Sequence, residues 1–122
     1  MGEALTIEVR HEQGCVIVAV AGEIDISTVT PLRECLFEVA ASGAPVVADL
    51  EQVSFIDSVG LATLVGAAKR AAAHGGSMRV VGALPKIREL VHITELDRRI
   101  PLFHTLDEAL VFRATASSKP PF

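Results

Sequence analysis

Residues Val53–Leu64 read VSFIDSVGLATL, and they join the pattern of a buried strand to the pattern of a helix. The segment Val46–Leu50 before them is apolar except for Asp49 and predicts a strand that is covered on both faces. From Ser58 to about His74, apolar residues recur at helical spacing until Gly75-Gly76 ends the helix. The polar pair Asp57-Ser58 therefore lies at a strand-to-helix junction.

The junction residues admit more than one interpretation. Ser58 can act as the N-cap of the helix, a role worth about 1 kcal/mol. Asp57 can form ordinary turn hydrogen bonds, hold the serine, or contact a partner. Gly60 either keeps the approach to the turn open or packs closely against a neighbouring element.

The residues before Val46 predict a hairpin and a helix. Leu5–Arg10 alternates apolar and polar residues, as in a strand with one wet face, and Cys15–Ala21 is continuously apolar. Gly14 ends the polar turn between them. Gly22–Asp25 breaks the apolar run, and Ser27 or Thr28 then caps a helix that ends at Ser42-Gly43.

The residues after Gly76 predict a third buried strand at Met78–Val81 and a helix that opens at Pro85. Ile100–Phe103 fits a short strand, which Pro101 confines to a sheet edge. Thr105 and Glu108 form a capping box for a last helix. We expect one domain over residues 1–115 and a flexible tail over residues 116–122.

Strands that alternate with helices after an initial hairpin predict an α/β fold. We expect a mostly parallel mixed sheet of about five strands with an antiparallel first strand, and about four helices. Functional loops in such sheets lie at the carboxyl ends of the strands. The loops expected there are Gly22–Ser27 and Glu51–Ser58.

Composition narrows the class of protein. The chain has 122 residues, 50% of them hydrophobic, and a net charge of −4 from 15 acids and 11 bases, which argues against nucleic-acid binding. No leader or membrane span is expected, so the predicted location is the cytoplasm. Cys15 and Cys35 are the only cysteines; we expect both in the core, although a redox role stays open.

The sequence does not favour catalysis. The serine motif Asp57-Ser58-Val59-Gly60 lacks the GxSxG elbow of serine hydrolases, and no phosphate-cradling glycine motif is present. The four histidines have no ligand spacing. We therefore expect no enzyme activity, no cofactor and no metal.

Three stretches together resemble the STAS-domain anti-sigma factor antagonists, over roughly Leu5 to Phe112. They are Gly22-Glu23-Ile24-Asp25; Asp49-Leu50 with Val53–Leu61; and Leu96-Asp97-Arg98 with Leu102-Phe103 and Leu106–Leu110. The middle stretch, similar to the family's phosphorylation loop, is the most specific. Val59 departs from the family, which commonly has a small polar residue there.

The resemblance implies a regulatory switch. The unphosphorylated antagonist would bind an anti-sigma factor with serine kinase activity and free a sigma factor, phosphorylation of Ser58 would end the binding, and a phosphatase would reset it. The implied partner-binding residues are Asp25, Asp57, Ser58, Val59, Gly60 and Leu61. The alternative is a STAS subunit of a larger signalling scaffold or lipid-transport assembly, with a structural or binding role.

Overall fold

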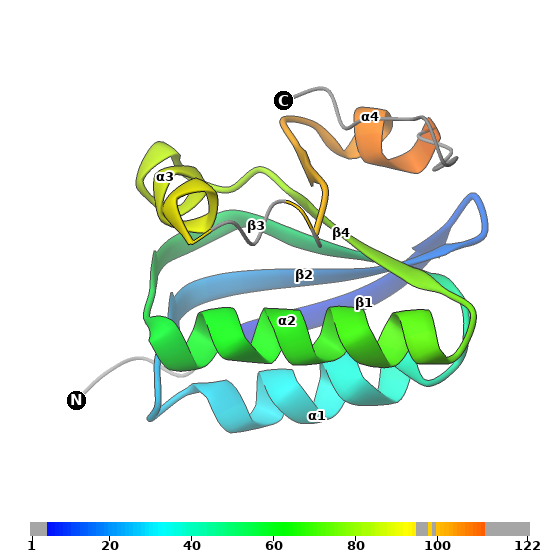
Figure 1. Ribbon diagram of the computed structural model, residues 1–122, viewed down its shortest axis with the longest axis horizontal. Coiled ribbons are helices and arrows are strands. Elements are labelled where there is room, and N and C mark those ends of the chain that lie inside the picture. The colour runs from blue at the N-terminus through cyan, green and yellow to red at the C-terminus, as the bar shows by residue number, and fades with distance from the viewer. Residues whose placement is uncertain (1–4, 95–97, 99, 112–122) are drawn as a thin grey trace.

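The computed structural model describes residues 5–94, 98 and 100–111, and these form an α/β fold with five strands and four helices (Figure 1). The elements in chain order are β1 Thr6–Glu12, β2 Cys15–Ile24, α1 Val29–Ala40, β3 Pro45–Ile56, α2 Ser58–Ala73, β4 Ser77–Val81, α3 Pro85–Ile93, β5 Leu102–Phe103 and α4 Leu106–Val111. The predicted number of strands and helices is confirmed. The predicted tail at residues 116–122 lies outside the described residues.

The strands form one mixed sheet in the order β1-β2-β3-β4-β5. β1 is antiparallel to β2, and each later pair of neighbours is parallel, as predicted. The β1–β2 hairpin turns at Gln13-Gly14, where both residues have positive φ (50° and 80°). Two successive residues of this kind match the twist of a tight hairpin, and glycine takes the second place at no steric cost.

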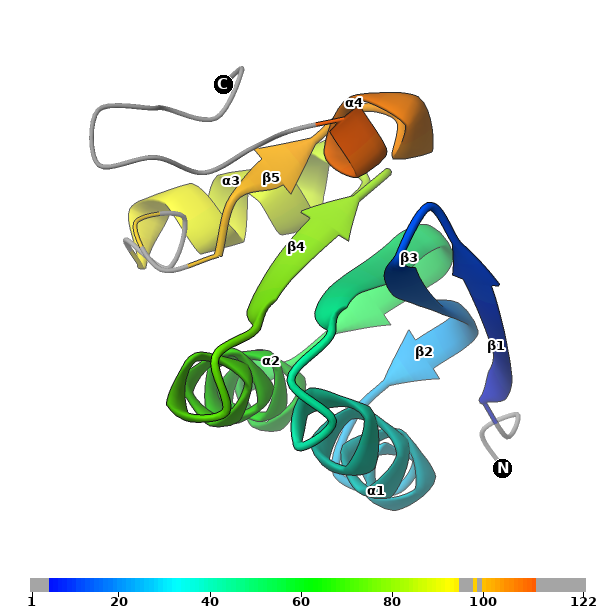
Figure 2. The same ribbon diagram turned by 90° about the vertical axis from the view of Figure 1, so that its right-hand side faces the viewer.

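Helices cover the two faces of the sheet unequally (Figure 2). α1, α2 and α3 contribute buried side chains to a cluster on one face, together with Val18, Ala48 and Val80 from the strands. α4 covers part of the other face, where Ala109 and Leu110 pack in a smaller cluster with Ile17 and other strand residues. The central strands are buried on both faces over the stretch that both layers cover, which explains their continuous apolar runs.

Two strands are longer than the sequence predicts. β2 continues to Ile24 rather than ending at Ala21, and β3 continues to Ile56 rather than ending at Leu50. Parallel pairing between the two persists through two register shifts, although Glu51 and Gln52 are exposed. The predicted loops Gly22–Ser27 and Glu51–Ser58 were therefore too long: only residues 25–28 and Asp57 separate strand from helix.

Three smaller predictions concern the two strands at the edges of the sheet and the last helix. Val9, expected on the buried side of β1, is 44% exposed at the edge of the sheet. β5 starts only after Pro101, and its place at the edge of the sheet is confirmed. The capping box of α4 is confirmed by hydrogen bonds from Thr105 N to Glu108 Oε1 (3.0 Å) and from Glu108 N to Thr105 Oγ1 (3.2 Å).

The two cysteines lie on opposite faces of the sheet. Cys15 is 3% exposed in the cluster beneath α4, so its predicted core role is confirmed. Cys35 is only half-buried, on α1, where it packs against the cluster on the other face. Burial, aided by the charge of Glu38, raises the pKa of the Cys35 thiol above its ordinary value. Both thiols are free, and a disulfide between them would have to pass through the sheet.

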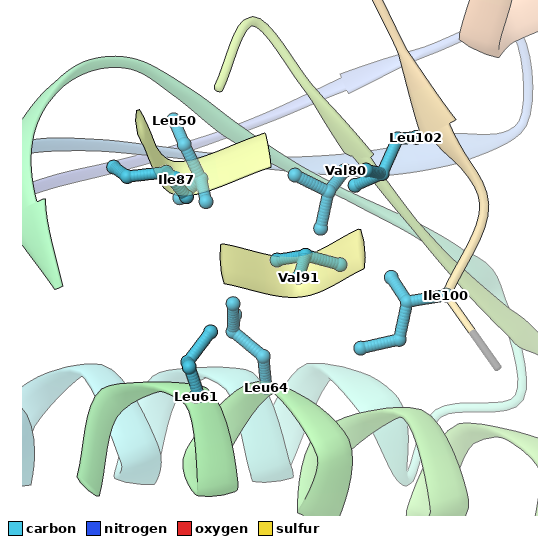
Figure 3. A pocket seen from close by; sticks show the side chains of 8 residues that line it. All are labelled: Leu50, Leu61, Leu64, Val80, Ile87, Val91, Ile100 and Leu102. Carbon is cyan, nitrogen blue, oxygen red and sulfur yellow. The ribbon is translucent and has the colours of Figure 1, made fainter. Parts of the chain in front are cut away.

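A cavity of about 10 Å³ remains between α2, α3 and the sheet (Figure 3). Its lining is wholly aliphatic: Leu50, Leu61, Leu64, Val80, Ile87, Val91, Ile100 and Leu102. The space is about that of one water molecule and offers no polar partner for it, so it is a small packing defect rather than a ligand site.

Within the described parts of the chain, no helix is long and apolar enough to cross a membrane.

Candidate functional site

Ser58 is the first residue of α2, and its side chain is exposed. The N-cap of this helix is Asp57, whose extended backbone (φ −99°, ψ −174°) lets Oδ1 accept a hydrogen bond from Gly60 N at 2.9 Å. The interpretation of Ser58 as the N-cap is therefore wrong, because the residue before it holds that position. Since Asp57 caps the helix, the Ser58 hydroxyl is left at the surface, at the positive end of a 16-residue helix.

The loops that follow β2 and β3 lie side by side. Ile24 pairs with Ile56 at the ends of the two strands, and Asp57 N donates a hydrogen bond to Ile24 O at 3.1 Å. Asp25 and Asp57, which directly follow these paired residues, thus belong to the same edge of the sheet as Ser58. This edge is the carboxyl end of the parallel strands, where the sequence predicted the functional loops.

The Asp25 carboxylate organises its own turn. Its Oδ1 accepts hydrogen bonds from Ser27 N (2.9 Å) and from the Ser27 hydroxyl (2.6 Å). The Thr28 hydroxyl, which is buried, donates to Glu23 O (2.7 Å) and accepts from Asp25 N (2.9 Å). Thr28 does occupy the N-cap position of α1, but its side chain makes no capping hydrogen bond there. Thr28, one of the two predicted residues, is thus the N-cap by position, but the hydroxyls of Ser27 and Thr28 form hydrogen bonds within the turn and not with the helix.

The hydroxyl of Ser27 is the largest cause that holds the pKa of Asp25 below its ordinary value of 3.8. Desolvation opposes this shift, and the Ser27 N–H and the Thr28 groups add to it. A lowered pKa in the folded state means that the carboxylate stabilises the turn above its unfolded pKa. That stability is lost as the pH falls through the lower folded value.

We expect Ser27→Ala to raise the pKa of Asp25 towards its ordinary value, because the strongest hydrogen bond to the ionised form is removed. An NMR titration of the carboxyl carbons measures this directly. Thr30→Ala is the matched control, since Thr30 is exposed in the first turn of α1, and the hydrogen bonds that Asp25 accepts come from Ser27, Thr28 and Val29. An unchanged Asp25 pKa in Ser27→Ala would show that the turn is held in another way.

Gly60 is buried and closely packed. A Cβ atom placed on it would lie 2.5 Å from Ile56 Cγ1 and 2.7 Å from Ile24 Cγ2. The structure therefore decides between the two interpretations of this glycine: it lets α2 approach the strand ends. Leu61 is only 7% exposed, and Val59 is half-buried against the core. Of the six residues predicted to bind a partner, Gly60 and Leu61 offer little surface.

A groove of about 500 Å³ runs from Ser58 along α2 to the end of α3. Its lining residues are Ser58, Leu61, Ala62, Val65, Gly66, Lys69 and Thr94. The sequence analysis missed this groove, although small residues at 62 and 66, four apart on an otherwise well-formed helix, were a visible signal. It also missed the exposed Ile26 (75%), an apolar residue between Asp25 and Ser27.

Comparison with known proteins decides the family, because the STAS domain model matches residues 6–109. This chain belongs to the STAS domain family. It is 33% identical over 111 residues to the anti-sigma-F factor antagonist RsfB of Mycobacterium tuberculosis, with 88% of each chain covered. It is 34% identical over 92 residues to the anti-sigma-B factor antagonist of Bacillus subtilis, covering 75% of this chain and 84% of that one.

A crystal structure of an anti-sigma factor antagonist from Mycobacterium paratuberculosis shares the fold of this STAS domain. The two are 37% identical, with a TM-score of 0.80, and the match covers 88% of this chain and 92% of that one. The resemblance predicted from the three sequence stretches is confirmed. Part of the third stretch, Leu96-Asp97, lies outside the described residues.

The polar groups of this STAS domain do not assemble into a metal centre within the described residues. No three side chains of His, Cys, Asp or Glu there come together as ligands. Asp25 accepts a hydrogen bond from Ser27 N and Asp57 accepts one from Gly60 N, and the side chain of Ser58, which directly follows Asp57, is exposed. This edge of the sheet therefore carries an exposed hydroxyl, at Ser58, and two carboxylates that are held by hydrogen bonds in neighbouring turns.

Proposed function

We propose that this STAS domain is an anti-sigma factor antagonist that is switched by phosphorylation of Ser58. In the unphosphorylated state it binds an anti-sigma factor of the serine kinase type in the cytoplasm, and the sigma factor is freed. It acts by binding and not by catalysis. The relatives at 33–37% identity, which carry the name of anti-sigma factor antagonists, support the partner class.

The observation that carries the proposal is the division of roles between Asp57 and Ser58. Asp57 caps α2 through Gly60 N, so the helix does not depend on the serine hydroxyl. A kinase can thus transfer the γ-phosphoryl group of ATP to Ser58 Oγ, with ADP leaving and the hydroxyl proton passing to the kinase, without removing the cap. The added charge of about −1.5 to −2 meets the positive end of a helix, which tolerates it.

The same charge changes the surface that a partner meets. An interface that fits a neutral hydroxyl at the start of α2 would have to desolvate a phosphate on the edge of the sheet that carries Asp25 and Asp57. Repulsion and desolvation would expel the partner while the fold stays intact. A phosphatase that hydrolyses the phosphoserine would then restore the binding surface.

The proposal is tested by the intact mass of the protein after incubation with ATP and each purified anti-sigma kinase of the same cell. We expect wild type to gain one phosphate with at least one kinase, and Ser58→Ala to gain none. Ser54→Ala, which removes an exposed serine from β3, serves as the matched control and should gain the phosphate. If a kinase binds wild type and adds no phosphate, the switch is wrong and the domain is an unmodified binding module, as in a scaffold.

A further inference from the structure

The two edges of the sheet are built differently. β5, at one edge, has two residues and begins directly after Pro101, so it offers little backbone for another strand to pair with. β1, at the other edge, has seven residues and pairs with β2 in an unbroken register, without proline, glycine or bulge (Figure 2). Within the described residues β2 is its one neighbouring strand, and every second residue of β1 directs its N–H and C=O groups to the open side. The outer edge of β1 is therefore a surface on which another strand can pair.

The side chains of β1 divide between the two faces of the sheet. Val9 pairs with Val18, which belongs to the cluster under α1, and the Val9 side chain is 44% exposed. Arg10 pairs with Ile17, on the face that α4 partly covers, and Glu8 shares that face because residues two apart on a strand point the same way. The open edge thus presents an apolar side chain on one face, and an acid and a base on the other.

One register of self-pairing suits both faces. Antiparallel pairing of β1 with the β1 of a second copy, about a two-fold axis at Val9, opposes all seven residues of the strand. Val9 then meets Val9 of the second copy, and Glu8 meets Arg10 twice, once on each side of the axis. The contact covers exposed apolar surface, and opposite charges directly across an antiparallel pair are stabilising.

The neighbouring registers are unfavourable. If the helix layers of the two copies lie on the same face of the joined sheet, the axis has to pass between a residue and its own copy. An axis at Glu8 places two carboxylates against each other, and an axis at Arg10 does the same with two guanidinium groups. Axes further along β1 pair only the ends of the strands. Charged side chains usually keep edge strands apart, but on β1 they leave one full-length register attractive.

The ion pair already present on β1 is compatible with this contact. Arg10 Nε donates to Glu12 Oε2 at 3.0 Å, and the two side chains are 40% and 43% exposed. A guanidinium group has five N–H donors, so its terminal nitrogens can bind Glu8 of the second copy while Nε keeps its bond to Glu12. Arg10 would then join two carboxylates across the interface.

We infer that this STAS domain forms a dimer with a second copy of itself through the outer edges of β1, in the antiparallel register centred on Val9, so that the two five-stranded sheets become one. The contact is a single strand from each copy, about 24 Å long, so the dimer is in equilibrium with the monomer. β1 is two strands away from β3, which Ser58 follows, so the dimer carries two copies of the proposed switch. The inference goes beyond the proposed function and does not depend on it.

The test is the molar mass of the full-length protein, measured by sedimentation equilibrium from about 10 μM to about 1 mM, where we expect wild type to shift from monomer towards dimer. Glu8→Arg and Arg10→Glu should each raise the dissociation constant of the dimer by about tenfold or more, since the two-fold axis makes each substitution create two like-charge contacts. The matched controls, Glu34→Arg and Arg33→Glu, make the same changes of charge at exposed positions of α1. Both should stay within about twofold of wild type.

Mixing the two β1 variants tests the register itself. The Glu8→Arg chain has two basic residues at positions 8 and 10, and the Arg10→Glu chain has two acidic ones. We expect the two chains to associate with each other although each associates poorly with itself. The double variant Glu8→Arg/Arg10→Glu exchanges the charges and should dimerise like wild type.

Three outcomes would overturn the inference. Wild type that stays monomeric up to about 1 mM would show that β1 does not pair with itself. A dimer that the β1 variants weaken no more than the α1 controls do would place the contact on another surface. A mixture that does not associate, with both variants folded by circular dichroism, would exclude the register centred on Val9. None of these outcomes bears on the proposed function, which is tested by phosphorylation of Ser58.

Discussion

Ser58→Ala is expected to hold the anti-sigma factor whether or not ATP is present, whereas wild type is released once ATP is added. The affinity of the variant in ATP should exceed that of phosphorylated wild type by about 100-fold or more, since an uncompensated charge buried at an interface costs about 3–5 kcal/mol. The variant itself should fold normally. Its side chain is exposed, and the cap of α2 comes from Asp57.

The measurement is the dissociation constant of the complex, taken by titration calorimetry with and without ATP. Ser54→Ala is the control, because it removes another exposed serine of the same segment and should behave like wild type. Circular dichroism confirms that both variants are folded. A Ser58→Ala protein that is folded but releases its partner in ATP would show that the switch lies elsewhere.

A carboxylate at position 58 should reproduce the effect only in part. Ser58→Asp adds a single charge, while phosphoserine carries about −1.5 to −2 and three acceptor oxygens. We therefore expect phosphorylation of wild type to cause the large loss of affinity for the anti-sigma factor, and Ser58→Asp to cause a smaller loss.

The position of Ser58 was predictable from local pattern. An apolar strand pattern, a polar pair and then helical spacing place Asp57-Ser58 at a helix start, and the structure confirms that start. Which of the two residues caps the helix was not predictable. Both types are favoured N-caps, and the choice depends on the extended backbone of Asp57, which its hydrogen bond to Ile24 O supports.

The length of the strands depends on contacts that the local sequence does not contain. Glu51 and Gln52 look like the beginning of a loop, yet β3 continues because β2 runs beside it to Ile24. Polar residues are tolerated there, since their side chains remain exposed. The two loops were thus predicted at the correct edge of the sheet, but their predicted starts were several residues too early.

Gly60→Ala is expected to lower the free energy of unfolding by about 1–3 kcal/mol, although alanine is the better helix former. The new Cβ would lie 2.5 Å and 2.7 Å from atoms of Ile56 and Ile24, and both isoleucines are nearly fully buried. Both atoms are bonded directly to the Cβ of their isoleucine and cannot swing away without the side chain repacking, so the first turn of α2 must move. Denaturation by urea measures the change.

Gly66→Ala is the matched control on the same helix, and it should differ in sign. Its Cβ would meet the tip of the half-buried Phe37 ring at 3.0 Å, which a small rotation of the ring relieves, so we expect a gain of up to about 1 kcal/mol. If Gly60→Ala is as stable as wild type, the strand ends yield more easily than the distances indicate.

The consequence for the switch follows from Gly60 N, which donates to the Asp57 carboxylate at 2.9 Å. A displaced first turn stretches that hydrogen bond and moves Ser58 with it, so Gly60→Ala should also slow phosphorylation, whereas Gly66→Ala leaves the position of Ser58 unchanged.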